Sequence, residues 1–192
     1  MTTELTRLRV DAQENRDRIL AAAAELFSER GLDIGMRDIA RRAEVGPATL
    51  YRRFPTRQAL IDEAFSVELQ ACRQIVVDAC ADPDAWRGFT GAVRRLLAMN
   101  VRNRGFVDAL VSTTPTEVFV RHRRELLGLL GGLARRAQNE GMLRADFTIG
   151  DLVLVLSAGR SLSAGSRDGL AAAADRLADL AIDAFRARSG AA

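Results

Sequence analysis

Residues 36–57 read MRDIARRAEVGPATLYRRFPTR, and this stretch decides the fold. Apolar residues at helical spacing predict a short helix over residues 36–43. Pro47 favours the start of a second short helix, because proline has no N–H and the first turn of a helix has no intrahelical partner for one. Two short helices joined by a tight turn, the second of them basic, are typical of a helix-turn-helix. The sequence therefore predicts a recognition helix over residues 47–53.

The residues of this motif divide into an inner and an outer face. Ile39 on the first helix is expected to meet Leu50 on the second, and Ala43 is small enough to let the two helices approach closely. The opposite face of the second helix is then free to enter the major groove of DNA. The exposed positions on that face are predicted to be Pro47, Ala48, Thr49, Arg52 and Arg53.

Helices are also predicted on both sides of the motif. Apolar spacing indicates a first helix over residues 16–30, which Gly31 ends. Thr56 is expected to cap a long fourth helix that runs to about residue 80. Residues 1–14 are polar and are predicted to form a flexible N-terminal arm, for which a minor-groove contact and a frayed, solvated end remain alternatives.

The positive charge of the chain is concentrated in the motif. All 28 basic residues of the 192-residue chain are arginines, and the formal net charge is +3. Six arginines against two acidic residues give residues 37–57 a net charge of +4, so the other residues together carry −1. A basic island on a slightly acidic body is the pattern expected of a local surface that contacts phosphates.

The rest of the chain is predicted to be helical. Apolar periodicity and conventional breaks indicate helices over residues 84–102, 104–111, 116–139, 148–163 and 167–188, and no segment alternates as a strand. The fold class is therefore all-α. We expect an N-terminal three-helix helix-turn-helix DNA-binding domain at residues 15–62 and a larger helical ligand-binding and dimerisation domain at residues 63–192.

Several kinds of chemistry lack the residues they need. One histidine and two cysteines do not make a metal site at a recognised spacing, and no phosphate-binding glycine loop follows a strand, so neither a metal, a cofactor nor an enzyme activity is expected. Cys72 and Cys80 are expected to be structural thiols, with a redox sensor as the alternative. No signal segment opens the chain and no apolar run reaches the about 20 residues of a membrane span, which favours a cytoplasmic protein without a membrane partner.

The N-terminal third of the chain resembles the TetR family of transcriptional regulators. The resemblance is carried by Arg18-Ile19-Leu20-x-Ala22-Ala23-x-x-Leu26-Phe27 with Gly31, by Arg37-Asp38-Ile39-Ala40, and by residues 49–60, which read TLYRRFPTRQAL. The wording of residues 45–57 is similar to that of the SbtR-like subgroup. The resemblance covers about residues 16–65 and implies a dimeric regulator whose helical body holds a sensor.

Residue by residue, the resemblance implies DNA contacts of two kinds. Tyr51 is expected to donate its hydroxyl to a phosphate, and Arg37 to reach the DNA backbone. Arg57 stands where the family usually has a lysine and is expected to help position the protein. The residues left to read base edges are Thr49 and Arg52, with Pro47 and Ala48 beside them.

The sequence departs from the family pattern around the motif. The loop Leu32-Asp33-Ile34-Gly35 is one residue shorter and lacks the hydroxyl that commonly caps the second helix, so Asp33 or Gly35 must take that role. Glu44 replaces the usual glycine of the turn, and Arg53 replaces a frequent histidine.

The C-terminal part carries a predicted dimer interface and a predicted pocket. We expect a homodimer through the last two helices, with an intrachain core as the alternative, at Leu152, Leu156, Leu177, Leu180, Ala181 and Phe185. A ligand pocket is predicted between the fourth helix and the three that follow it, although each of its residues could instead be plain core. These residues are Phe65, Leu69, Trp86, Phe89, Met99, Phe106 and Phe119. His122 lies among arginines and is expected on an exposed face.

Together these patterns predict a ligand-responsive regulator, expected to be a repressor. It would bind a palindromic double-stranded DNA operator as a homodimer and be released by a small apolar or amphipathic effector. The alternative is a DNA-binding regulator without a small-molecule ligand, either constitutive or controlled by a protein partner.

Overall fold

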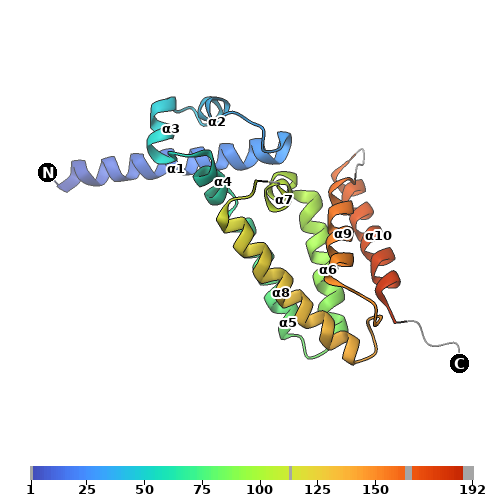
Figure 1. Cartoon of the computed structure of the whole chain (residues 1–192). Coiled ribbons are helices and arrows are strands. Elements are labelled where there is room, and N and C mark those ends of the chain that lie inside the picture. Colours follow the sequence, from blue (N-terminus) through green and yellow to red (C-terminus); the bar gives the residue numbers. More distant parts are fainter. Residues whose placement is uncertain (1, 113, 163–165, 188–192) are drawn as a thin grey trace, which may run out of the picture. The chain divides into compact units, whose positions relative to one another are not determined.

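A computed structural model describes residues 2–112, 114–162 and 166–187 (Figure 1). In these ranges the chain forms ten helices and no named strand; Leu143 and Arg186 make one isolated antiparallel bridge. The all-α prediction is confirmed. The chain divides into two compact units, which are described separately below.

The first unit contains the N-terminal helices and one helix from the middle of the chain. It comprises Met1–Val67 together with Arg104–Phe119. Its helices are α1 (Thr2–Arg30), α2 (Met36–Arg42), α3 (Pro47–Arg53), α4 (Arg57–Ala64) and α7 (Arg104–Val111). Helix α1 packs against α2, α4 and α7, and α2 packs against α3.

The close packing of α1 on α7 depends on one glycine. Gly105 is buried, and a Cβ atom there would lie 2.4 Å from the carbonyl oxygen of Phe27, well inside van der Waals contact. The ring of Phe65 packs beside this contact, with its centroid 5.8 Å from that of Phe27 and 5.9 Å from that of Phe106. The ring of Phe119 completes the cluster, 6.3 Å from Phe65. These four rings form the aromatic core of the first unit.

The second unit contains the longer helices. It comprises Glu68–Asn103 and Val120–Ala192. Its helices are α5 (Ser66–Ala81), α6 (Ala85–Arg102), α8 (Glu117–Asn139), α9 (Ile149–Arg160) and α10 (Arg167–Phe185), of which the first residues of α5 and α8 belong to the first unit. Helix α6 packs against both α9 and α10.

A second aromatic cluster lies at the base of this unit. The ring of Phe89 is 5.4 Å from Phe147 and stacks on Trp86 at 6.2 Å, and Phe147 and Phe185 are 4.9 Å apart. The side-chain amide of Gln138 donates to three carbonyls of residues 144–147, which fixes the connection from α8 to α9. The buried aromatic rings and the hydrogen-bonded connection between α8 and α9 both stabilise this unit.

The predicted helix boundaries agree with the structure in most places and fail in two. The helices expected over residues 84–102, 104–111, 116–139, 148–163 and 167–188 are observed as α6 to α10, with ends that differ by at most three residues. The prediction of a single long fourth helix is wrong, because the helix is interrupted at Phe65 and forms α4 and α5 instead. Phe65 is fully buried among three other rings, so packing of its side chain outweighs the helix propensity of its neighbours.

The second difference concerns the N-terminus. Residues 2–14, predicted as an arm, continue α1 as helix. This segment contains no glycine or proline and is rich in Glu, Leu, Arg and Gln, which are good helix formers. The predicted functional division at residues 62 and 63 stays a prediction, since the two compact units are defined by packing alone.

Candidate DNA-binding surface

Helices α2 and α3 form the predicted helix-turn-helix. The turn between them is closed by backbone hydrogen bonds from the N–H of Ala43 to the carbonyl of Ile39 (2.9 Å) and from the N–H of Val45 to that of Ala40 (3.0 Å). Glu44 has a φ of 54°, which is the left-handed region that glycine adopts most easily. The geometry of the turn is thus the one for which the family uses glycine, although this chain has glutamate there.

The inner face of the motif is buried as the spacing predicts. Ile39 and Leu50 are fully buried, and Ala40 and Ala43 are almost so. Phe54, at the C-terminal end of α3, is also buried. These side chains hold α3 in place, so its other face is presented to solvent.

The outer face of α3 carries the residues predicted to meet DNA. Tyr51 is 48% exposed, which is unusual for so large a ring. Pro47, Ala48, Arg52 and Arg53 are exposed, and Thr49 is half-buried. Arg37 is exposed in the first turn of α2. The structure therefore brings seven of the eight predicted DNA-binding residues to the surface of the motif or its edge.

The arginines of this region differ in whether they have an acidic partner. Arg41 is paired with Asp38, and Arg42 with Glu25 at 2.6 Å. Within the part of the chain whose side chains are described, Arg37, Arg52 and Arg53 have no carboxylate partner. Unpaired guanidinium groups on one small helical motif are available for phosphates and base edges.

Arg57 behaves differently from the other seven. Its Nη1 donates to the carbonyl of Ile34, and its guanidinium lies 5.8 Å from the centre of the Phe27 ring. The side chain is half-buried and holds the loop between α1 and α2. In this conformation Arg57 secures the loop that leads into α2, a role that the sequence did not suggest.

The caps of the three short helices follow the residue types. Of the two candidates, Asp33 and Gly35, it is Gly35 that occupies the N-cap position of α2, without a side-chain hydrogen bond. Asp38 supplies negative charge to the first turn of the helix. Gly46 and Pro47 begin α3. The hydroxyl of Thr56 accepts from the N–H of Ala59 at 3.1 Å, which confirms Thr56 as the N-cap of α4.

The residues predicted to line a ligand pocket are distributed over both units. Phe65, Phe106 and Phe119 belong to the aromatic core of the first unit, whereas Trp86 and Phe89 belong to that of the second. Leu69 is buried on α5. Met99 lines a groove of about 600 Å³ in the second unit, between α5 and α6. The other residues of this groove are Glu68, Ala71, Gln74, Ile75, Arg95, Ala98, Arg102 and Asn103.

The residues predicted for a dimer interface fall into two groups. Leu152, Ala181 and Phe185 are buried in the second unit itself. Leu156 and Leu177 are half-buried, and Leu180 is 52% exposed. Val153 and, at 70%, Leu154 on α9 are also exposed, although the apolar character of this segment predicts burial on more than one side.

The histidine and the cysteines do not form a reactive centre. His122 is 8% exposed rather than exposed as predicted, its Nε2 has no hydrogen-bond partner, and burial lowers its pKa below 6.5. Burial raises the pKa of the Cys72 thiol to about 12 and also raises the pKa of Cys80. Thiols with raised pKa values carry little thiolate, which argues against the redox-sensor alternative.

The described ranges contain neither a cluster of metal ligands nor a membrane-spanning helix. Among these residues no group of three or more His, Cys, Asp or Glu side chains could hold a metal ion. None of the helices in residues 2–112, 114–162 and 166–187 has the length and apolar character needed to cross a membrane.

The fold and the surface define a helix-turn-helix DNA-binding protein, and comparisons with known proteins give its family. Residues 19–64 match the family of bacterial regulatory proteins of the tetR type, and residues 84–187 match the C-terminal domain of SbtR-like transcriptional regulators. The chain belongs to the TetR family of transcriptional regulators, with an SbtR-like C-terminal domain.

Three similar proteins illustrate the match. The TetR transcriptional regulator SCO0520 from Streptomyces coelicolor is 35% identical, with a TM-score of 0.58 over 91% of this chain and 99% of that one. The HTH-type transcriptional repressor KstR of Mycolicibacterium smegmatis is 33% identical over 110 residues, which cover 56% of this chain and 52% of KstR. AibR, in complex with isovaleryl coenzyme A and operator DNA, shares the fold at 16% identity, with a TM-score of 0.73 over 90% of this chain and 97% of AibR.

Proposed function

We propose that this regulator is a ligand-responsive repressor that binds a palindromic operator as a homodimer. The observation that carries the proposal is the outer face of α3, where Arg52 and Arg53 are exposed beside the exposed Tyr51 and have no carboxylate partner among the described side chains. A buried inner face and an unpaired basic outer face are what a helix needs in order to enter the major groove. The similarity to the repressor KstR supports repression, and not activation, as the mode of regulation.

The side chains of this surface divide into positioning and reading roles. Tyr51, Arg37 and Arg53 are proposed to hold phosphates, which fixes the register of the helix on the duplex. Arg52 is proposed to form two hydrogen bonds to a guanine, with Thr49, Pro47 and Ala48 against neighbouring base edges. Arg57 is proposed to act indirectly, since its guanidinium already holds the carbonyl of Ile34.

A homodimer through α9 and α10 is part of the proposal. The exposed apolar residues Leu154, Val153 and Leu180 on these two helices support it, because contiguous apolar side chains on a surface mark sites of association. Leu156 and Leu177 are half-buried and are proposed to lie at the edge of the same interface. A two-fold dimer presents two recognition helices, which is why a palindromic operator is expected.

The effector is proposed to bind in the groove between α5 and α6. Its volume of about 600 Å³ lies in the range of small-molecule sites. Ala71, Ile75 and Met99 offer apolar contacts, while Arg102, which has no carboxylate partner among the described residues, offers positive charge. An amphipathic effector with an anionic group fits this lining. AibR, which has the same fold, is described with both a coenzyme A thioester and operator DNA, so the architecture accommodates two such ligands.

A regulator without a small-molecule effector is the second candidate. It is favoured by the interior position of Phe65, Trp86, Phe89 and Phe106, which pack against other aromatic rings. A thermal-shift screen against metabolites separates the two candidates, because a ligand that binds the native state raises the melting temperature. If no anionic amphipathic compound raises it, the effector-free regulator is the better account. In either case we expect the protein to act in the cytoplasm, where the chromosome is.

The test of the proposed function is operator selection. Random and genomic duplexes are passed over the purified protein at physiological salt, and the retained sequences are read. We expect a palindrome whose half-sites are about one helical turn apart, roughly 34 Å. Tyr51→Phe should weaken binding to all retained sequences to a similar degree, because a phosphate contact carries no sequence information. Retention without any shared sequence would contradict the proposal.

A further inference from the structure

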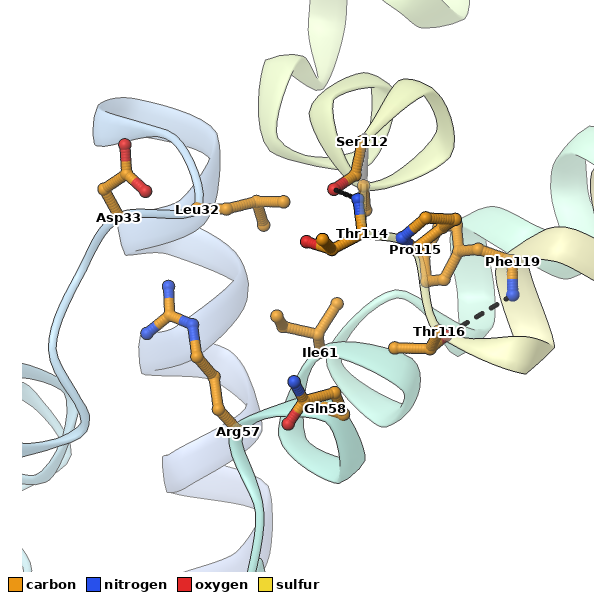
Figure 2. A pocket seen from close by; sticks show the side chains of 11 residues that line it. Leu32, Asp33, Arg57, Gln58, Ile61, Ser112, Thr114, Pro115, Thr116 and Phe119 are labelled. Atoms are coloured by element: carbon orange, nitrogen blue, oxygen red, sulfur yellow. Dashed lines mark hydrogen bonds between the residues drawn. The ribbon is translucent and has the colours of Figure 1, made fainter.

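The first unit contains a pocket that the proposed function does not use. Its volume is about 180 Å³, and all of its lining residues belong to the first unit (Figure 2). They come from the loop after α1, from α4 and from the segment that follows α7. The lining consists of Leu32, Asp33, Arg57, Gln58, Ile61, Ala109, Ser112, Thr114, Pro115, Thr116 and Phe119. The pocket therefore lies within the DNA-binding unit and is separate from the groove between α5 and α6.

Two of the hydroxyls at this pocket already have partners. The hydroxyl of Ser112 accepts from the N–H of Thr114 at 3.1 Å, and the hydroxyl of Thr116 donates to Asp62. In Figure 2 the Thr114 side chain is directed toward Leu32 across the pocket. Ile61 and Phe119 are buried apolar residues on the wall. A bound molecule would therefore meet an apolar wall at Ile61 and Phe119, with the polar side chains of Gln58 and Thr114 beside it.

Arg57 is the one basic residue of the lining, and its guanidinium has spare hydrogen-bonding capacity. A guanidinium carries five N–H donors, and among the described residues Arg57 uses one of its nitrogens on the carbonyl of Ile34. It forms no ion pair in the described part of the chain. Asp33, the one acidic residue of the lining, is exposed and makes no ion pair with it. A positive charge without a counter-ion, at the edge of a small cavity with an apolar wall, favours an anion with an apolar body.

We propose that this pocket binds a small organic monocarboxylate, whose carboxylate pairs with Arg57 and whose apolar body lies against Leu32, Ile61 and Phe119. The size agrees with this class, since an apolar cavity of about 150 Å³ is enough to hold a benzene ring. A carboxylate that accepts two parallel N–H bonds turns the planar guanidinium toward itself and away from the carbonyl of Ile34. Ile34 directly precedes Gly35, the N-cap of α2, so binding loosens the start of the helix-turn-helix.

One consequence rests on the proposed function: occupancy of the pocket weakens operator binding. The site itself is tested without DNA. Benzoate is titrated into the full-length, isotope-labelled protein, and backbone amide shifts are followed by NMR. Benzyl alcohol and benzylammonium serve as the neutral and cationic probes of matched size. We expect benzoate to shift the amides of Leu32, Asp33 and Thr116, with a dissociation constant about tenfold lower than that of benzyl alcohol, the factor that a charge-assisted hydrogen bond supplies.

Two variants test the assignment of the pocket. Arg57→Gln should raise the dissociation constant of benzoate to that of benzyl alcohol, while Arg30→Gln, a matched change at an exposed arginine outside the pocket, should leave it unchanged. Thr114→Leu fills the pocket from an exposed position and should abolish binding even if Arg57→Gln disturbs the loop. Circular dichroism checks that each variant is folded.

Three results would overturn the proposal. Benzoate could bind Arg57→Gln as well as it binds the wild type, it could shift amides of α5 and α6 only, or benzylammonium could bind more tightly than benzoate. A separate titration with selected operator DNA tests the coupling. If benzoate occupies the pocket and the operator affinity does not fall, the site stands and its link to DNA binding is wrong. If no operator can be selected but benzoate binds, the proposed function is wrong, whereas the assignment of the pocket as a carboxylate site still holds.

Discussion

The arginines of α3 differ from several arginines of the second unit in whether they have an acidic partner. In the second unit Arg73 is paired with Glu125 at 2.9 Å, Arg94 with Asp179, and Arg144 with Asp151 at 3.1 Å. Arg136 donates to the carbonyls of Cys80, Asp82 and Pro83 at the end of α5. Arg52 and Arg53 on α3 have no such partner among the described residues. Arg121 and Arg124 on α8 are exposed and have no carboxylate partner in the described part of the chain either, so unpaired charge indicates a candidate DNA-binding surface only where it lies on the outer face of a helix-turn-helix.

The largest effect that follows from this comparison is on operator affinity. Arg52→Ala should weaken binding to the selected operator by about 1 to 3 kcal/mol, that is about fivefold to 150-fold, since it removes a bidentate contact to a base. Arg94→Ala removes an equal charge from a paired position and should change the affinity by less than about twofold. Fluorescence anisotropy with labelled operator measures both. Equal losses for the two variants would mean that only net charge matters.

A smaller effect is expected at the turn of the motif. Glu44 occupies the left-handed region at a φ of 54°, which costs a non-glycine residue about 1 kcal/mol. Glu44→Gly should therefore stabilise the protein by about 1 kcal/mol, seen as a higher denaturant midpoint with an unchanged slope. Glu14→Gly, at an exposed position in the middle of α1, is the control and should destabilise by a similar amount. A lower midpoint for Glu44→Gly would show that the glutamate contributes contacts that offset its backbone strain.

The paired arginines of the second unit should each matter little for stability. The side chains of Arg73 and Glu125 are 54% and 42% exposed, so solvent screens their attraction. Arg73→Ala should lower the free energy of unfolding by no more than about 0.5 kcal/mol, as measured by urea denaturation. A loss several times larger would mean that the pair organises the packing of α5 on α8 and is not simply a surface contact.

His122 breaks the pattern of the second unit, because its buried Nε2 has no partner. Burial lowers its pKa, and the nearby Arg73 lowers it further, although Glu125 acts in the opposite direction. A histidine whose pKa is lower in the folded than in the unfolded state binds its proton first in the unfolded state. Stability should therefore fall as the pH drops below about 6.5, and His122→Gln should remove this part of the slope between pH 7 and pH 5. Identical slopes for the two proteins would contradict the assignment.

Sequence reasoning succeeded where residue types carry local signals. Pro47, Thr56 and Gly31 mark helix ends by their own backbone and side-chain chemistry, so the boundaries around the motif followed from them. The break at Phe65 has no glycine or proline to announce it, because it arises from tertiary packing of an aromatic ring. The burial of His122 was missed because it lies among arginines in the sequence while its own side chain faces the interior.

The same distinction holds for the candidate surface. The outer residues of α3 could be predicted because helical geometry alone decides which side chains lie opposite the buried Leu50. The inward position of Arg57 could not, since it depends on a carbonyl that lies 23 residues away in the chain. The polar pocket around Arg57 was missed for this reason, as it combines three segments that only the fold brings together.

The most direct test of the central claim is a base-substitution profile of the selected operator. Each position of one half-site is changed in turn, and the affinity is measured for the wild type and for Arg52→Ala. If the unpaired outer face of α3 reads DNA, Arg52→Ala should lose discrimination at one position in each half-site and keep it at the others. A uniform weakening at all positions, or an unchanged profile, would contradict the assignment of Arg52 to base reading and of α3 to the major groove.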